Sequence, residues 1–453
     1  MTVHARTVLG ALFAVSAVAV AAQDLKLTYP QTARGTVVEE QFGEKVADPY
    51  RWLENDVRSD PAVADWVKAQ NAVTQGYLGT LPQRGWFAQR IRSLMDYERF
   101  GLPQKAGAFY FYTRNSGLQN QSQLFVRQGL TGTPRLLLDP NTWAKDGATA
   151  LDDWEPSQNG KLLAYSVQDG GSDWRTIKVL DTVTGKVLKD EIKWAKFTGI
   201  AWVGNEGFLY SRFPEVKPGQ EFQSLNKNQA VWYHKVGTPQ AADKLVYATP
   251  EQPDLGHGAE VTHDGRWMVI VTAKGTDSKY EVHVARLAKG KWGKPQPLIK
   301  GLEHDWRLIE GMGDTLYFIT NKGAPKLKVV KADLSRGAAQ AQMVELIPER
   351  AETLERAQIV GNRLILNYLK DAASVAEVVS LDGKPVRQIS LNSIGTAAGF
   401  AGKPGDPETF YAFTSFNQPA GIFRFDSNTG QSTPFATPKL TFNPDEYAIE
   451  QRF

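Results

Sequence analysis

Short runs of aromatic and aliphatic residues recur about every 50 residues between residues 105 and 437. Polar loops separate the runs, and turns such as Asp181 to Gly185 and Leu381-Asp382-Gly383 follow many of them. Repeats of this kind are typical of stacked β-sheets, because a four-stranded sheet cannot bury both of its faces alone. The pattern predicts a mainly β fold, a seven-bladed β-propeller, with two β-sandwiches as the alternative. The runs begin at Phe109, Leu162, Phe208, Trp267, Leu316, Leu364 and Phe410.

A different pattern precedes this region, from residue 24 to about residue 100. Ser59 and Asp60 can cap a helix, and Pro61 suits its first turn. Apolar residues then recur at helical spacing, and a second set follows Pro82. We expect two helices, with apolar positions at Val63, Trp66, Val67, Val73 and Tyr77 in the first and at Phe87, Ile91, Leu94 and Met95 in the second.

The first 22 residues resemble a secretory signal peptide. His4 and Arg6 precede an apolar stretch from Val8 to Val20, and small residues follow it. The apolar stretch is short for a membrane-spanning helix of about 20 residues, although a short membrane anchor is the alternative. We expect residues 1–22 to be removed and the mature protein to be periplasmic or secreted, with no membrane association after cleavage.

The charge balance and the absence of cysteine exclude several classes of function. Lysine and arginine total 52 against 49 acidic residues, a net charge of +3 that gives no electrostatic case for nucleic acid. Without cysteine the chain has no disulfides, no thiol nucleophile and no thiolate metal ligand. Its stability must therefore come from packing.

One motif near the amino terminus is informative as an ordered string of residues. Asp48-Pro49-Tyr50-Arg51-Trp52-Leu53-Glu54, taken alone, predicts a turn packed on a helix. The string resembles the amino-terminal motif of the prolyl oligopeptidase family. Further similar segments follow in the family's order up to the last residue, among them Ser172-Asp173-Trp174, Phe197 to Trp202 and Phe442-Asn443-Pro444.

The resemblance implies a serine peptidase architecture. In that family an α/β-hydrolase domain with a Ser-Asp-His triad cleaves after proline, a propeller admits short peptides, and no cofactor is used. The implied division is a signal peptide (1–22), a helical segment that would pack on a hydrolase domain (23–104), the propeller (105–437) and the start of a truncated α/β-hydrolase domain (438–453).

No catalytic residue is identifiable in the sequence. A nucleophile elbow requires Gly-x-Ser-x-Gly, which does not occur, and in the closest string Trp174 replaces the second glycine after Ser172. The six histidines lack a triad or metal-ligand context, so we expect no metal site. The resemblance makes Phe197 and Thr276 candidates for the substrate cavity, with a blade-core residue and a loop residue as the respective alternatives.

Two functions therefore compete. The first is a prolyl oligopeptidase truncated to its propeller and inactive alone, with short proline-containing peptides and a separately encoded hydrolase domain as partners. The second is a non-catalytic periplasmic propeller that binds peptides or a protein, and a gene fragment without a stable product is a third possibility. A Gly-x-Ser-x-Gly segment encoded beyond the Phe453 codon would favour the first.

Overall fold

A computed structural model describes residues 27–288 and 291–453, in two compact units. The first unit comprises residues up to Ala88 with Pro218–Gln223, and the second comprises Gln89–Lys217 and Ser224–Phe453. The predicted signal peptide, residues 1–22, lies outside the described residues. Within the described part of the chain, no helix combines the length and apolarity needed to cross a membrane.

The predicted helices are confirmed. Asp60 caps the first helix, because its carboxylate accepts hydrogen bonds from the backbone N–H groups of Ala62 and Val63 at 2.8 and 3.4 Å. Apolar side chains of the second helix, including Phe87 and Ile91, remain exposed. The elements of this region are β1 (Val38–Gln41), β2 (Glu44–Ala47), the 3-10 helix η1 (Arg51–Glu54), α1 (Pro61–Gly79) and α2 (Arg84–Met95).

The Asp48–Glu54 motif builds the turn between the β1–β2 hairpin and α1. The Arg51 guanidinium lies 2.6 Å from the Asp48 carboxylate, 2.7 Å from that of Glu39 and 3.4 Å from that of Glu54. The Trp52 indole donates to the Ala33 carbonyl at 3.0 Å. The motif therefore stabilises the local turn, because its polar groups form the ion pairs and the hydrogen bond that hold the turn together.

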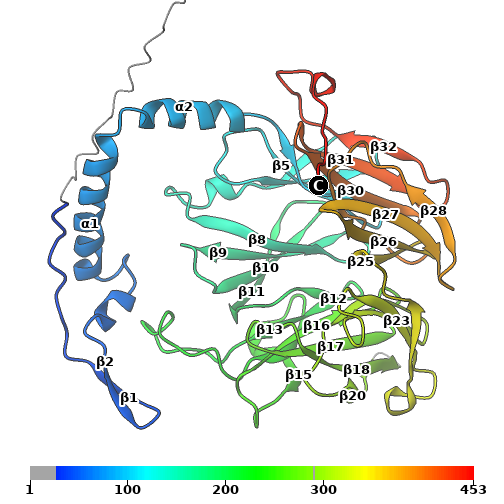
Figure 1. The fold of residues 1–453 in the computed structure, drawn as a ribbon. Coiled ribbons are helices and arrows are strands. Elements are labelled where there is room, and N and C mark those ends of the chain that lie inside the picture. Colours follow the sequence, from blue (N-terminus) through cyan, green and yellow to red (C-terminus); the bar gives the residue numbers. More distant parts are fainter. Residues whose placement is uncertain (1–26, 289–290) are drawn as a thin grey trace, which may run out of the picture. The chain divides into compact units, whose positions relative to one another are not determined.

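The second unit consists of antiparallel sheets (Figure 1). Five separate sheets have four or five strands each and form blades: β3 (Arg99–Phe100), β4 (Gln104–Ala106), β5 (Phe109–Asn115), β6 (Gln123–Gln128) and β7 (Arg135–Leu138); β16 (Leu255–Val261), β17 (Trp267–Lys274), β18 (Tyr280–Ala288), β19 (Lys291–Trp292) and β20 (Gln296–Ile299); β21 (Trp306–Met312), β22 (Thr315–Thr320), β23 (Lys328–Asp333) and β24 (Met343–Ile347); β25 (Thr353–Val360), β26 (Arg363–Lys370), β27 (Ala373–Ser380) and β28 (Pro385–Ile389); β29 (Thr396–Gly399), β30 (Glu408–Ser415), β31 (Gln418–Asp426) and β32 (Ser432–Ala436).

A sixth sheet has eight strands. It contains β8 (Thr149–Pro156), β9 (Leu162–Asp169), β10 (Arg175–Asp181), β11 (Val187–Ala195), β12 (Ala201–Val203), β13 (Gly207–Arg212), β14 (Ala230–Lys235) and β15 (Lys244–Ala248). Short 3-10 helices lie at η2 (Pro140–Thr142), η3 (Gln240–Ala242), η4 (Ala338–Gln340) and η5 (Pro444–Glu446).

The prediction of seven blades is wrong, although the mainly β class is confirmed. The structure has five separate blades, because the strands expected to form a second and a third blade belong to the single eight-stranded sheet. The pairing of Ala195 in β11 with Arg212 in β13 joins the strands of the expected second blade to those of the expected third. All seven apolar runs are strands, namely β5, β9, β13, β17, β22, β26 and β30.

Neighbouring sheets bury one another's apolar faces. One cluster joins the β16–β20 and β21–β24 sheets through residues such as Trp267 and Phe318. The next joins β21–β24 to β25–β28 through Tyr317 and Leu364. Such burial between sheets supplies the stability that disulfides cannot supply in a chain without cysteine.

The first and last blades meet without sharing a strand among the described sheets. Their contact is a small apolar cluster that includes Tyr110 and Phe410, and in Figure 1 the red strands lie beside β5. Beside this cluster, the buried Glu408 carboxylate accepts hydrogen bonds from the Tyr110 hydroxyl (2.6 Å), the Lys105 ammonium (3.0 Å) and the Arg424 guanidinium.

These contacts keep Glu408 charged. Burial alone would raise the pKa of Glu408, but the hydrogen bonds from Tyr110, Arg424 and Lys105 outweigh it and hold the pKa below its usual value. We define Lys105, Tyr110, Asp406, Glu408 and Arg424 as the closure cluster; Asp406 lies 2.8 Å from the Lys105 ammonium.

We predict that Glu408→Gln lowers the free energy of unfolding by about 2 kcal/mol, because the Tyr110 hydroxyl and the half-exposed Lys105 and Arg424 lose a charged hydrogen-bond acceptor. Urea unfolding followed by circular dichroism measures the change. Glu345→Gln is the matched control, since its carboxylate is exposed and lies 3.0 Å from the Lys328 ammonium; its effect should stay within about 0.5 kcal/mol. Equal effects of the two substitutions would contradict the closure role of Glu408.

A second buried polar cluster holds the eight-stranded sheet together. The His234 ring lies between two carboxylates, with Nδ1 2.7 Å from Asp243 and Nε2 2.9 Å from Asp190. The Tyr210 hydroxyl donates to the other Asp243 oxygen at 2.6 Å. Burial alone would lower the pKa of His234, but hydrogen bonds to Asp190 and Asp243 raise it to about 9.

We predict that the unfolding free energy falls as the pH rises from 6.5 to 9. The folded protein retains the His234 proton in this range while the unfolded chain releases it, so the stabilisation present below pH 6.5 is lost by about pH 9. The loss is on the order of 3 kcal/mol, at about 1.4 kcal/mol per pKa unit.

Urea unfolding at a series of pH values tests this prediction. His234→Gln should lose most of the alkaline slope. His304→Gln should retain it, because the His304 ring has no hydrogen-bond partner in the described part of the chain. An unchanged slope in His234→Gln would show that another group titrates.

Candidate functional site

A cavity of about 630 Å³ lies where the inner strands of the sheets converge. We call it the central cavity. It is lined by residues of β4, β8, β12, β16 and β21 and by the segment 401–410. The turns that follow the inner strands contact one another, since the Asn159 N–H donates to Asn205 at 2.8 Å and the Gly313 N–H to Asp264 at 3.1 Å. The carboxyl-terminal ends of these strands therefore lie at one end of the cavity.

Three glutamates lie near this end. Glu155 is on β8, Glu260 on β16 and Glu310 on β21, and all three line the cavity. Burial raises the pKa of Glu155 and of Glu260 to about 7, and the neighbouring charge of Glu310 adds to the rise at Glu260. Burial likewise raises the pKa of Glu310. The cavity thus holds carboxyl groups that change charge near neutral pH.

The positive groups of the cavity differ in how firmly they are paired. Lys105 belongs to the closure cluster, where hydrogen bonds to Asp406 and Glu408 outweigh burial and raise its pKa. Lys403 also lines the cavity, and burial lowers its pKa. Glu155 accepts a hydrogen bond from the Gln104 amide at 2.6 Å, which links β8 to the first blade.

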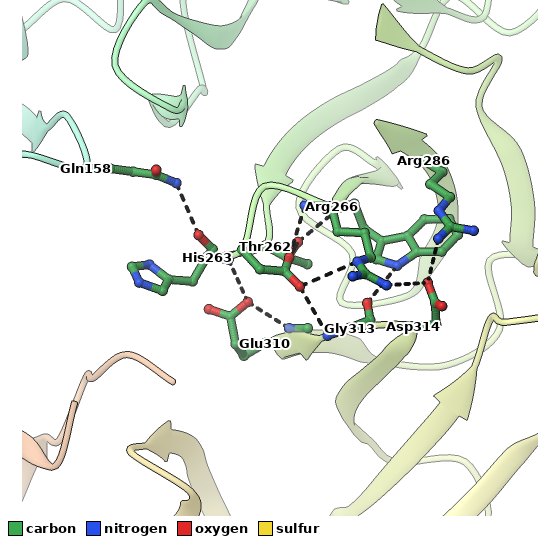
Figure 2. Close-up of polar contacts among 11 residues, drawn as sticks. Gln158, Thr262, His263, Arg266, Arg286, Glu310, Gly313 and Asp314 are labelled. Atoms are coloured by element: carbon green, nitrogen blue, oxygen red, sulfur yellow. Dashed lines mark hydrogen bonds and ion pairs between the residues drawn. The ribbon is translucent and has the colours of Figure 1, made fainter. Parts of the chain in front are cut away.

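His263 is held in place by its backbone while its ring stays free of the neighbouring polar network (Figure 2). Its N–H donates to Glu310 at 3.0 Å, and its carbonyl accepts from the Gln158 amide at 3.2 Å. Figure 2 shows the ring pointing away from Arg266 and Asp314. Burial and the charge of Lys403 lower the pKa of His263, so the ring is neutral at pH 7.

Charged and amide side chains predominate among the polar groups that line the cavity. Thr409 is the one hydroxyl residue among its described lining residues, and its hydroxyl donates to the Ala401 carbonyl at 2.7 Å. In the described ranges, no group of three or more histidine and acidic side chains could hold a metal ion. Charged and amide side chains around a partly open volume of this size suit a polar solute or a peptide side chain.

Other histidines are used in packing. His257 is buried between Thr249 and Thr272, whose hydroxyls lie 3.0 and 2.9 Å from its ring nitrogens, and burial lowers its pKa to about 4. His234 is enclosed by two aspartates. Ser172 lies in the β9–β10 turn, where its hydroxyl accepts from the Trp174 N–H at 3.1 Å. The Ser211 hydroxyl donates to the backbone carbonyl of His257 at 2.6 Å, but in the described ranges no serine hydroxyl is hydrogen-bonded to a histidine ring.

Phe197 and Thr276 lie at the opposite, amino-terminal ends of the inner strands. Phe197 precedes β12 with a left-handed backbone (φ 52°), and its side chain is 53% exposed. Thr276 is exposed in the turn after β17, whose Lys274 pairs with Leu255 at the start of β16. The Lys196 ammonium lies 5.1 Å from the Phe197 ring centroid. Neither candidate lines the central cavity, and their proposed contact with substrate stays a prediction.

Sequence reasoning missed the glutamates of the cavity, although a signal existed. Glu155 precedes the turn glycine Gly160 by the same five residues that separate Glu260 from Gly265. Each glutamate pairs with the second strand of its repeat, Glu155 with Ala164 and Glu260 with Val269. Aligning the repeats on their turns would have placed these acids at one level of the cavity.

Comparisons with known proteins agree with this architecture. Residues 30–438 match the family description "Prolyl oligopeptidase, N-terminal beta-propeller domain". The chain is 35% identical over 443 residues to a prolyl endopeptidase of Elizabethkingia miricola, which covers 98% of this chain and 62% of that protein. It is 29% identical to a dual function macrocyclase-peptidase of Amanita bisporigera, covering 94% of this chain and 62% of the relative.

Solved structures give the same result. A structure from a study of two prolyl endopeptidases and their inter-domain dynamics is 50% identical with a TM-score of 0.73, covering 92% of this chain and 60% of that one. Prolyl oligopeptidase B from Galerina marginata, bound to a 25mer macrocyclization substrate, is 28% identical with a TM-score of 0.79 and covers 92% of this chain and 62% of that one.

The chain spans about three fifths of the length of the relatives that it matches. The match to the family description nevertheless extends over most of its own residues, in the region that forms the sheets. The chain therefore belongs to the prolyl oligopeptidase family, in which it corresponds to the N-terminal β-propeller domain.

Proposed function

We propose that this chain is the substrate-gating propeller of a serine peptidase that cleaves short peptides after proline. The match of residues 30–438 to the propeller domain of prolyl oligopeptidases carries the proposal. On this account an α/β-hydrolase domain, rather than the propeller, supplies the nucleophile, base and acid. The chain itself selects peptides by size and by contacts near Phe197.

The surface at the amino-terminal ends of the inner strands supports this role. Phe416 is fully exposed in the β30–β31 turn, and Phe442 and Tyr447 are exposed close by. The Asn417 amide donates to the carbonyls of Pro444 and Tyr447 at 3.1 and 3.2 Å, which holds the segment against this turn. A contiguous exposed apolar patch is typical of a surface that another domain covers.

We further propose that the protein is exported, on the basis of the pattern in residues 1–22. Export and peptide hydrolysis are compatible, because the fold is stabilised by packing and needs no reducing compartment. Amino-terminal sequencing of protein secreted by a bacterial host tests the proposal, with a mature terminus at Gln23 as the expected result.

We predict that the purified chain leaves a chromogenic Gly-Pro p-nitroanilide peptide uncleaved. A hybrid in which residues 30–438 replace the matching region of the Elizabethkingia miricola enzyme should cleave it, because the propeller then covers a complete triad. Turnover that copurifies with the chain alone would contradict the assignment of catalysis elsewhere. A hybrid that melts cooperatively but is inactive would favour a non-catalytic binding propeller.

We predict that Phe197→Ala in this hybrid raises KM by about tenfold and leaves kcat nearly unchanged, because an aromatic contact made equally in ground and transition states contributes uniform binding. Leu136→Ala is the control, since Leu136 is an exposed apolar residue on the outer strand β7. Steady-state kinetics with a short proline peptide measure both. Equal KM values for Phe197→Ala and the parent hybrid would remove Phe197 from the substrate cavity.

A further inference from the structure

Two glutamates of adjacent blades face the same end of the central cavity. Glu260 is near the carboxyl end of β16 and Glu310 is near that of β21. Their charges repel, which contributes to the raised pKa of Glu260. Two charged carboxylates placed near one another are mutually destabilising unless a cation lies between them.

The carboxylate of Glu260 has no hydrogen-bond or ion-pair partner in the part of the chain that the structure describes. The Glu260 side chain is exposed to solvent within the cavity that it lines. Glu310 is fixed instead, because the N–H groups of Gly311 and His263 donate to one of its oxygens at 2.7 and 3.0 Å. One carboxylate is thus pre-oriented and the other is unpaired, which is an arrangement typical of a binding site.

The other charged groups lining the cavity do not neutralise this pair. Lys105 is held by Asp406 and Glu408 at 2.8 and 3.0 Å. Lys403 acts on Glu155, where its charge lowers the pKa. His263 is neutral at pH 7, because burial and Lys403 lower its pKa. An incoming cation would therefore meet two carboxylates without a competing internal partner.

We propose that Glu260 and Glu310 bind a cationic side chain of a peptide, a guanidinium or an ammonium group, at the end of the central cavity opposite Phe197. The inference rests on the proposed function, since peptides are the solutes that the protein would admit. A guanidinium suits the pair because its planar N–H groups can bridge two carboxylates. A metal ion suits it less, because the described residues offer no third carboxylate or histidine ligand beside them.

The cavity volume and the charge of the whole chain support this choice of ligand. About 630 Å³ accommodates an arginine or lysine side chain with part of its backbone. The chain as a whole carries a net charge of +3, so non-specific attraction does not draw cations to its surface. Preference for a cationic peptide would therefore reflect a local site.

Isothermal titration calorimetry of the full chain tests the proposal at pH 8, above the pKa of about 7 for Glu260. The probes are acetyl-Gly-Arg-Gly-amide and acetyl-Gly-citrulline-Gly-amide, which differ in charge and hardly in shape. The arginine peptide should bind at least about tenfold more tightly. Glu260→Gln and Glu310→Gln should each remove most of this preference, because glutamine keeps an acceptor oxygen and loses the charge.

Glu191→Gln is the matched control. Its carboxylate is exposed on the outer strand β11 and lies 3.5–3.6 Å from Lys178 and Lys193, so the preference should persist. Thermal melts identify any variant that fails to fold. If either Glu260→Gln or Glu310→Gln does not fold, the loss of preference is judged from the other variant. Equal binding of the two peptides by the parent chain, or a preference retained in folded Glu260→Gln, would overturn the proposal. The measurement needs no turnover, so its failure is distinguishable from failure of the proposed peptidase role.

Discussion

Burial of two apolar faces per sheet is the constraint on which this structure depends. A four-stranded sheet exposes both faces when isolated, and only neighbouring sheets on either side can cover them. The first and last blades must then meet as well, and here they do so through the closure cluster and a small apolar contact rather than through a common strand. The buried, charged Glu408 contacts Lys105 and Tyr110 of the first blade and Arg424 of the last. Its hydrogen bonds therefore help to hold the two blades together.

The central cavity follows from the same constraint. Sheets that bury one another's faces bring their inner strands together, and the turns after these strands interlock through contacts such as Gly313 to Asp264. Polar residues on the inner strands then line the cavity without all being paired, as Glu260 shows. The opposite ends of these strands carry Phe197 and an apolar surface. The carboxyl-terminal ends of the inner strands thus carry charged groups that line the cavity, and their amino-terminal ends carry exposed apolar groups outside it.

Much of the fold could be predicted from the sequence, and the reasons are local. The Asp60 cap, the Pro61 position and the apolar runs act over a few residues, so the two helices and the recurring strands were found. The number of blades could not be predicted, because the pairing of Ala195 with Arg212 joins β11 to β13 and leaves no periodic signal in the sequence. The described part of the second unit therefore has five separate blades and one eight-stranded sheet.

The site was harder to predict than the fold. In the sequence, an unpaired glutamate in a strand looks like any solvent-exposed residue. It can be assigned to the cavity only once its strand is known to be the inner strand of a sheet. His263 shows the same difficulty. Its position beside the cavity is set by hydrogen bonds of its backbone to Gln158 and Glu310, which belong to other sheets. The family resemblance was recognisable because the Asp48–Glu54 motif is contiguous, whereas the cavity is assembled from residues far apart in the chain.

Hydrogen–deuterium exchange of the unmodified chain tests most directly whether the first and last blades close the arrangement. Peptides covering β5 (Phe109–Asn115) and β30 (Glu408–Ser415) are expected to exchange as slowly as peptides covering β22 (Thr315–Thr320) and β26 (Arg363–Lys370), which have a sheet on both sides. Much faster exchange confined to β5 and β30 would show that these blades do not bury one another, and it would contradict the account.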